Sequence, residues 1–301
     1  MKIKKIPLFI TLILLFAFGG YFGQWQFQKA RKEQIAYEAW EELQQSVKTE
    51  ISRFNGKAGI VIKDLETGRE LAFEKSELFP SASLAKIPLM AACFLAAEQG
   101  RIRLDDNIAL KSSDKLTGSG LLKDMPEGTV FSVEKLIGLM IYDSDNTAAN
   151  ILTDLTGLDY LNSTFGDFGL ENTDLTRKIA DYQSRDRGIE NYTTAQDMSL
   201  LLDKLYLRKL GSEDISDECI SMLKLTRMND RIPRYLPPEI SIAHKTGLEN
   251  SVCHDAGIVF TPKGDFIIVV LTKHANATSA PSKEFIAKVS LHTYKYFNQL
   301  Q

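Results

Sequence analysis

A serine and a lysine three residues apart form the first candidate for chemistry. Ser83 and Lys86 have the spacing that places two side chains on one face of a helix. A free serine is a poor nucleophile and needs a nearby base. A lysine serves as that base where burial and neighbouring positive charge lower its pKa. The same spacing recurs where a solvated helix face is the simpler interpretation, at Ser112/Lys115, Ser132/Lys135 and Ser221/Lys224.

The context of Ser83 separates it from those other pairs. It follows Phe79-Pro80 and opens a strongly apolar segment that extends to Ala97. Such a segment predicts a helix buried inside the protein. The Ser83 hydroxyl is therefore expected at a buried, electropositive helix start.

Two tripeptides, each found once, follow Ser83 along the chain. Ser144-Asp145-Asn146 lies between two predicted helices, where it offers a hydroxyl to relay a proton and an amide to bind a substrate carbonyl. The alternative is a helix cap. Lys245-Thr246-Gly247 ends a predicted strand, where the lysine and threonine can hold a carboxylate and the following N–H groups an oxyanion. The alternative is a strand end with an exposed lysine.

The elements that must position these residues suggest an α+β fold. Strands are predicted near both chain ends, at 59–62, 69–73, 240–246, 256–260 and 266–272. Helical periodicity dominates the middle, at 83–97, 133–142, 147–155 and 194–206, and a final helix is predicted at 281–297. We expect one antiparallel sheet built from both chain ends, with a largely helical insertion. The segment 175–191 shows no clean period and is predicted to be an ordered, functional loop.

Composition limits the classes of function. The chain has 301 residues, 44% of them hydrophobic and 25% charged, which is typical of a folded protein. A net charge of −3 argues against a nucleic-acid binder. Three cysteines without CxxC spacing argue against a disulfide framework and allow at most one bridge. No HExxH or Cys/His cluster occurs, so we predict no catalytic zinc.

The N-terminus has the pattern of an export segment. Lys2, Lys4 and Lys5 precede an apolar run from Ile6 to Phe22. A buried core helix is the alternative. We predict a signal peptide or membrane anchor at 1–23, a linker and the start of a first helix at 24–50, and an enzyme domain at 51–301. The protein is expected outside the cytoplasmic membrane, secreted or held there by this segment alone.

From about Gly56 to Tyr296, the chain resembles the class A β-lactamase family of penicillin-recognising serine hydrolases. S-x-x-K, S-D-N and K-T-G, in this order, are the signature of that family. The resemblance extends through Phe79–Lys86, Ser144–Asn150 and Ala243–Gly247. It implies a monomeric enzyme without a cofactor, whose partner is a small β-lactam or a cell-wall peptide.

The resemblance also implies catalytic roles. Ser83 attacks the lactam carbonyl and becomes acylated, Lys86 helps to deprotonate it, and Ser144 passes a proton to the leaving nitrogen. The backbone N–H groups of Ser83 and Leu248 form the oxyanion hole.

Substrate-binding roles follow in the same way. Asn146 binds the substrate's side-chain amide, and Lys245 and Thr246 face its carboxylate. His254 stands where some relatives have an arginine for the same carboxylate. The alternative for His254 is a strand histidine with a local hydrogen bond.

One part of the family pattern is missing. The E-x-x-L-N that supplies the deacylating glutamate is absent, and Tyr182-Gln183 is its nearest match. Glutamine cannot act as a general base. Asp181, Asp186 and Glu190 are candidate substitutes, each with a loop ion pair or helix cap as the alternative.

Three functions are therefore compared. The leading hypothesis is a β-lactam hydrolase. The others are a penicillin-binding D,D-peptidase-like enzyme with slow deacylation and a catalytically silent surface protein.

Overall fold

The computed structural model describes residues 8–299. Burial and side-chain contacts are described from Tyr21 onward, except at Gly23. The predicted positive residues Lys2, Lys4 and Lys5 lie outside the described residues. Among the residues that the structure describes, no helix is both long enough and apolar enough to cross a membrane.

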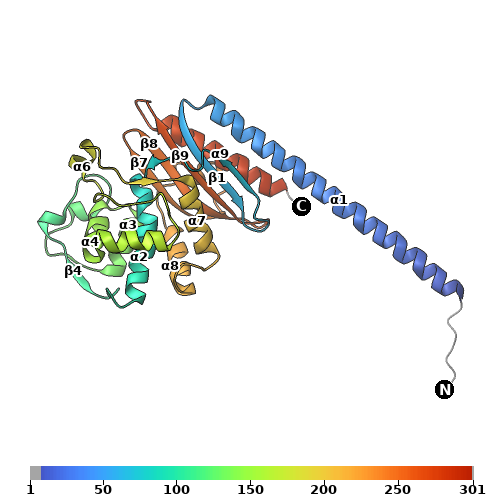
Figure 1. Ribbon diagram of the computed structural model, residues 1–301, viewed down its shortest axis with the longest axis horizontal. Coiled ribbons are helices and arrows are strands. Elements are labelled where there is room, and N and C mark those ends of the chain that lie inside the picture. Colours follow the sequence, from blue (N-terminus) through green and yellow to red (C-terminus); the bar gives the residue numbers. More distant parts are fainter. Residues whose placement is uncertain (1–7, 300–301) are drawn as a thin grey trace, which may run out of the picture.

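A five-stranded antiparallel sheet forms the centre of the molecule (Figure 1). Its strands follow the order β2-β1-β9-β8-β7. They are β1 Gly56–Asp64, β2 Glu70–Phe73, β7 Ser241–Glu249, β8 Val252–Phe260 and β9 Phe266–His274. Strand β1 pairs with β9 along its whole length, so the two ends of the chain join in one sheet. This arrangement confirms the predicted α+β fold.

Successive side chains along a strand point to opposite faces of the sheet, and both faces are buried. Ile60 and Ile62 of β1 join a core formed with the C-terminal part of α1 (Leu8–Arg53) and with α9 (Ala280–Gln299). Val61, between them, belongs to the core on the opposite face, where α7 (Ala195–Tyr206) contacts the sheet. A two-residue side-chain period is what a strand with two buried faces requires.

The inserted helical region surrounds a buried central helix. Helix α2 (Lys86–Glu98) follows a short 3-10 helix, η1 (Ala82–Ala85), and is buried over most of its surface. Pro88 is the third residue of α2, where its missing N–H costs little. The surrounding helices are α3 Val133–Tyr142, α4 Asn146–Thr156, α5 Leu158–Asp167 and α8 Glu213–Leu223.

Two short strand pairs and several 3-10 helices lie outside the main sheet. β3 (Phe79–Pro80) pairs with β6 (Tyr192–Thr193), and β4 (Asn107–Ala109) pairs with β5 (Val130–Ser132). Three further 3-10 helices are η2 (Ser112–Asp114), η3 (Leu122–Asp124) and η4 (Ile232–Tyr235). The predicted loop 175–191 is ordered and contains the short helix α6 (Tyr182–Asp186).

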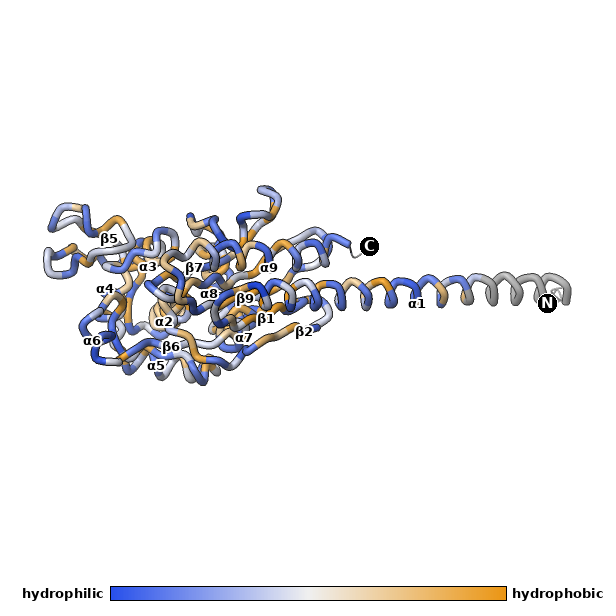
Figure 2. The backbone as a smooth tube through the Cα atoms, turned by 90° about the horizontal axis from the view of Figure 1, so that it is seen from above, coloured by the Kyte–Doolittle hydropathy of each residue, from blue (hydrophilic) through white to orange (hydrophobic). Residues whose placement is uncertain are grey.

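The segment 24–50 is helical throughout, in place of the predicted linker, because it lacks glycine and proline and is rich in helix formers. It belongs to α1, whose N-terminal part projects away from the body (Figure 1). Figure 2 shows hydrophilic and hydrophobic residues mixed along this projection. Side chains from Tyr21 to Glu38 are almost all exposed, and burial begins at Ala39 and Trp40.

Candidate active site

The entry to η1 is held in an unusual backbone conformation. Ala82 has a φ of 46°, and the Ser81 N–H donates to the Asn191 carbonyl at 2.8 Å. Side chains three residues apart eclipse one another along a 3-10 helix. Ser83 and Lys86 have this relation, and the Lys86 backbone N–H donates to the Ser83 carbonyl. The Ser83 side chain is half-buried.

The Lys86 amine connects η1 to the Ser144-Asp145-Asn146 turn. Lys86 is fully buried, and its Nζ donates to Ser144 O at 2.6 Å, Asn146 Oδ1 at 2.8 Å and Ser144 Oγ at 3.2 Å. Burial, followed by the nearby charge of Lys245, lowers the pKa of Lys86 well below its usual value. An amine in this position is suited to accept a proton.

Asp145 organises the turn. Its carboxylate accepts the Ala148 N–H at 2.9 Å as the N-cap of α4, and the Leu121 and Leu122 N–H groups at 2.6 and 2.8 Å. These bonds hold the neighbouring Ser144 at a φ of 54°. The tripeptide therefore contains both the predicted cap and a serine directed at the lysines.

Lys245 approaches the same serine from β7. Its buried Nζ donates to Ser144 Oγ at 2.9 Å and to Thr246 O at 3.0 Å. Burial lowers the pKa of Lys245 to about 7, opposed by Asp255 and reinforced by Arg231. The structure thus brings Lys86, Ser144 and Lys245 into one hydrogen-bonded group.

Gly247 permits the close approach of β7 to η1. A Cβ atom at this position would lie 3.3 Å from Ala82 Cβ and 3.4 Å from Ser81 O, which is tight. Leu248 follows and is 48% exposed. Because β7 is an edge strand, its outward-facing backbone groups are free of sheet pairing.

His254 has the local role that was the alternative to carboxylate binding. It is fully buried; its Nε2 bonds Pro80 O at 2.8 Å, and its Nδ1 accepts the Thr272 N–H at 3.1 Å. Burial lowers its pKa to about 4, so the ring is neutral at neutral pH. With both nitrogens engaged by backbone, His254 has no free donor for a substrate carboxylate.

The acidic residues of the loop 175–191 also have structural partners. Asp181 caps α6 by accepting the Ser184 N–H at 3.0 Å, and Glu190 forms an ion pair with the buried Arg177. Asp186 and Gln183 are exposed.

The loop approaches the site at a residue that sequence reasoning missed. Asn150 Nδ2 donates to the Ile179 carbonyl at 3.0 Å. Asn150 lies one turn beyond Asn146 on α4, so it shares the face that holds Lys86. Ile179 therefore comes near this group although its side chain is hydrocarbon. The one sequence signal for this role is that Asn150 follows Asn146 by four residues, which places both on one face of a helix.

Arg231 was also missed. It is 3% exposed, and its Nε lies 3.1 Å from Cys253 Sγ. Its charge contributes to the lowered pKa of Lys245, so Arg231 lies close enough to act on the Lys245 amine. No spacing marks it, because the packing of the segment before η4 against β8 places it there.

A family model described as the beta-lactamase enzyme family matches residues 42–297. The chain belongs to this family. Relatives of this β-lactamase family member include the β-lactamase VEB-1 of Pseudomonas aeruginosa. VEB-1 is 24% identical over 263 residues, which cover 81% of this chain and 86% of that protein.

Solved structures agree with the assignment. A β-lactamase from Sphaerobacter thermophilus is 29% identical with a TM-score of 0.79, covering 86% of this chain and 98% of that one. PBP-A is 30% identical with a TM-score of 0.79 and respective coverages of 86% and 96%. An ancestral class A β-lactamase is 25% identical with a TM-score of 0.78, covering 84% and 99%. The class A family predicted from the motifs is confirmed.

Proposed function

We propose that this chain is a serine hydrolase that opens the β-lactam ring through an acyl-enzyme on Ser83. The observation that carries the proposal is the buried group in which Lys86 and Lys245 both contact the Ser144 hydroxyl. Two buried amines around one hydroxyl lower each other's proton affinity and provide a path for a proton.

The reaction begins at Ser83. Neutral Lys86 accepts the Ser83 proton as the hydroxyl oxygen attacks the lactam carbonyl. The N–H groups of Ser83 and Leu248 stabilise the resulting oxyanion. The proton then passes through Ser144 to the lactam nitrogen as the C–N bond breaks, and Lys86 returns to its neutral form.

Substrate binding involves the neighbouring motifs. Protonated Lys245 and Thr246 face the substrate carboxylate, and Asn146 faces its side-chain amide. The carboxylate raises the pKa of Lys245 toward its usual value because it adds a partner for the charge. Arg231 adds a positive charge near Lys245, whereas the buried ring of His254 is neutral.

Two relatives support a β-lactam as the substrate. VEB-1 is a β-lactamase, and the L158E mutant of PBP-A, also 30% identical to this chain, forms an acyl-enzyme complex with penicillin G. The substrate is accordingly a small β-lactam.

A second candidate function is a penicillin-binding enzyme that retains the acyl group. It is favoured by the loop 175–191, where Asp181 is a helix cap and Glu190 an ion-pair partner. Ile179, the residue bonded by Asn150, has no group that activates water. The two candidates differ only in the second half of the reaction.

The proposed enzyme is exported. Residues 1–23 are the signal peptide or anchor, and the monomeric enzyme domain works outside the cytoplasmic membrane. Three lysines followed by an apolar run support this placement. The intact mass of the exported protein distinguishes cleavage from retention, and unchanged residence in the cytoplasm would contradict export.

Purified protein with a chromogenic cephalosporin and, separately, a fluorescent penicillin tests the function. Steady turnover supports the hydrolase, and a stable label without turnover supports the second candidate. Ser83→Ala is the control. Absence of both signals, with Ser83→Ala indistinguishable from wild type, would leave the catalytically silent protein.

A further inference from the structure

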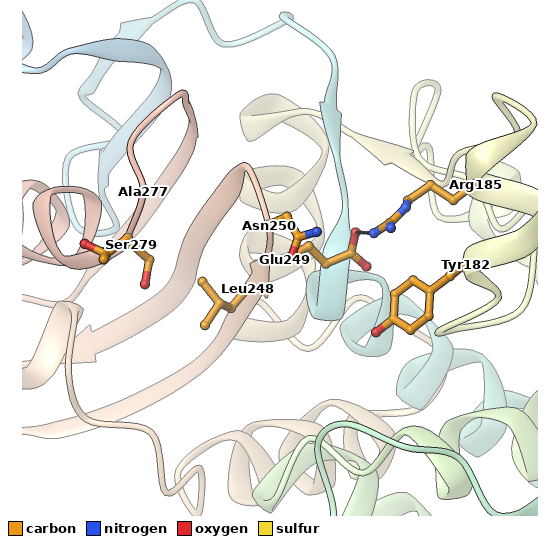
Figure 3. A pocket seen from close by; sticks show the side chains of 8 residues that line it. Tyr182, Arg185, Leu248, Glu249, Asn250, Ala277 and Ser279 are labelled. Carbon is orange, nitrogen blue, oxygen red and sulfur yellow. Dashed lines mark ion pairs between the residues drawn. The ribbon is translucent and has the colours of Figure 1, made fainter.

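A cavity of about 610 Å³ opens beside the end of β7. Residues 248–250 at the end of β7 form one part of its wall, Tyr182 and Arg185 of α6 another, and residues 277–279 complete the lining (Figure 3). Leu248 is the proposed oxyanion donor, so the cavity begins beside the proposed acylation site. A substrate's acyl side chain has room to extend into it.

Two opposite charges in this cavity lie close together without a direct hydrogen bond. Arg185 Nη1 is 3.6 Å from Glu249 Oε2, beyond hydrogen-bond distance. The other carboxylate oxygen, Oε1, is 3.8 Å from Nη2 of the buried Arg177. Figure 3 shows the Arg185 and Glu249 side chains directed toward one another. Glu249 thus lies between two guanidinium groups and retains capacity to accept hydrogen bonds.

Neighbouring side chains orient the Arg185 guanidinium but leave it able to donate further hydrogen bonds. Its guanidinium lies over the Tyr182 ring, 4.7 Å from the centroid, and its other acidic neighbour, Asp186, is 3.7 Å away. The side chains of Arg185 and Glu249 are 26% and 20% exposed. Each is therefore partly shielded from water and still accessible to a ligand.

We propose that this cavity binds the end of a substrate side chain that carries an ammonium group and a carboxylate on the same carbon atom. The ammonium donates to Glu249, and the carboxylate accepts paired N–H groups from Arg185. A neutral side chain would shield both charges from water without replacing their hydration. A side chain with one charge would satisfy only one of them. The inference rests on the proposed function, because it assumes acylation at Ser83.

The test compares acylation rates of the full chain by intact mass. The probes are three penicillins with α-aminoadipyl, adipyl and phenylacetyl side chains, which carry both charges, the carboxylate alone and neither. We expect the aminoadipyl compound to acylate about tenfold faster than the phenylacetyl one, as one net charge-assisted hydrogen bond would give. The adipyl compound should lie between them.

Two variants test which charge of the substrate side chain each residue binds. Glu249→Gln should remove the advantage of aminoadipyl over adipyl, and Arg185→Gln should remove that of adipyl over phenylacetyl. Each result is a ratio of rates on one variant, so a general loss of activity cancels. Arg208→Gln, which breaks the exposed Arg208–Asp217 pair on another surface, is the matched control and should keep the wild-type ratios.

A second arm uses D-alanyl-D-alanine peptides with the same three side chains and measures released D-alanine. A preference for the doubly charged group in either arm supports the inference and identifies the source of the ligand. Equal rates for all side chains in both arms, with Ser83 acylated, would overturn the inference and leave the proposed function intact. No acylation by any compound would overturn the proposed function and this inference with it.

Discussion

At the scale of single residues, the site depends on two lysines that need opposite protonation states. Lys86 acts as a base only when neutral, and Lys245 holds a carboxylate only when protonated. Burial lowers the pKa of both, and the charge of Lys245 lowers the pKa of Lys86 further. Both requirements are met where Lys86 has lost its proton and Lys245 still holds one.

We therefore predict a bell-shaped pH dependence for the second-order rate of acylation. The rate falls at low pH as Lys86 gains a proton, and at high pH as Lys245, with a pKa of about 7, loses one. Lys245→Arg should move the alkaline limb upward, because a guanidinium stays protonated. Labelling rates between pH 5 and 9 provide the measurement, with circular dichroism as the control for folding. An alkaline limb at the same pH in the variant would contradict this assignment.

The missing deacylation base gives a second prediction at this scale. Ile179→Glu should speed release of the acyl group by at least about tenfold, because it puts a carboxylate on the loop residue whose backbone carbonyl accepts a hydrogen bond from Asn150. Gln183→Glu adds the same group at an exposed position on α6 and is the matched control. Decay of the acyl-enzyme mass after removal of free penicillin measures the rate. Faster decay only in Gln183→Glu would show that the loop faces the site through α6 instead.

At the scale of elements, the S-D-N turn is stabilised by its aspartate. Asp145→Ala removes the acceptor for three buried or half-buried N–H groups, so we expect a loss of about 2–4 kcal/mol in the free energy of unfolding. Acylation should fall as well, because Ser144 loses its fixed backbone. Urea unfolding measures the change. Asp181→Ala, which removes the cap of the exposed helix α6, should cost less. Equal losses would refute the special role of Asp145.

The same scale shows what sequence patterns predict well. Helix α3 was predicted with its observed ends, Val133 and Tyr142, because its apolar period is clear. The motif residues Lys86, Ser144 and Lys245 were expected to meet, and they form direct contacts. Local spacing and motif order were sufficient in these cases.

Sequence patterns do not predict the direction of a side chain where tertiary contacts decide it. The alternation of side chains along β8 does not show what surrounds His254; its ring is enclosed by the backbone of Pro80 in β3 and Thr272 in β9. Gln183 matched a pattern by type, yet α6 turns it outward. Arg231 comes from a segment with no period at all. Helices α5 and α8 were missed although they are as long as α3.

At the scale of the molecule, α1 divides into a projecting part and a docked part. Removing residues 1–38 should leave thermal stability within a few degrees, because the side chains from Tyr21 to Glu38 are almost all exposed. Removing residues 1–50 also deletes Trp40, Leu43 and Val47, each of which contributes about 1.5–3 kcal/mol by burial. We expect that shorter protein to unfold or to melt far lower. Thermal unfolding of both truncated proteins is the measurement, and equal melting temperatures would show that α1 does not stabilise the domain.

The central claim is a convergence of chain segments around one activated hydroxyl. Its most direct test is the mass of the intact protein after incubation with penicillin G, followed by peptide mapping of any adduct. The account predicts one added penicilloyl group, located on Ser83 and absent from Ser83→Ala. An adduct on another residue, or an unmodified mass in a folded wild-type protein, would contradict it.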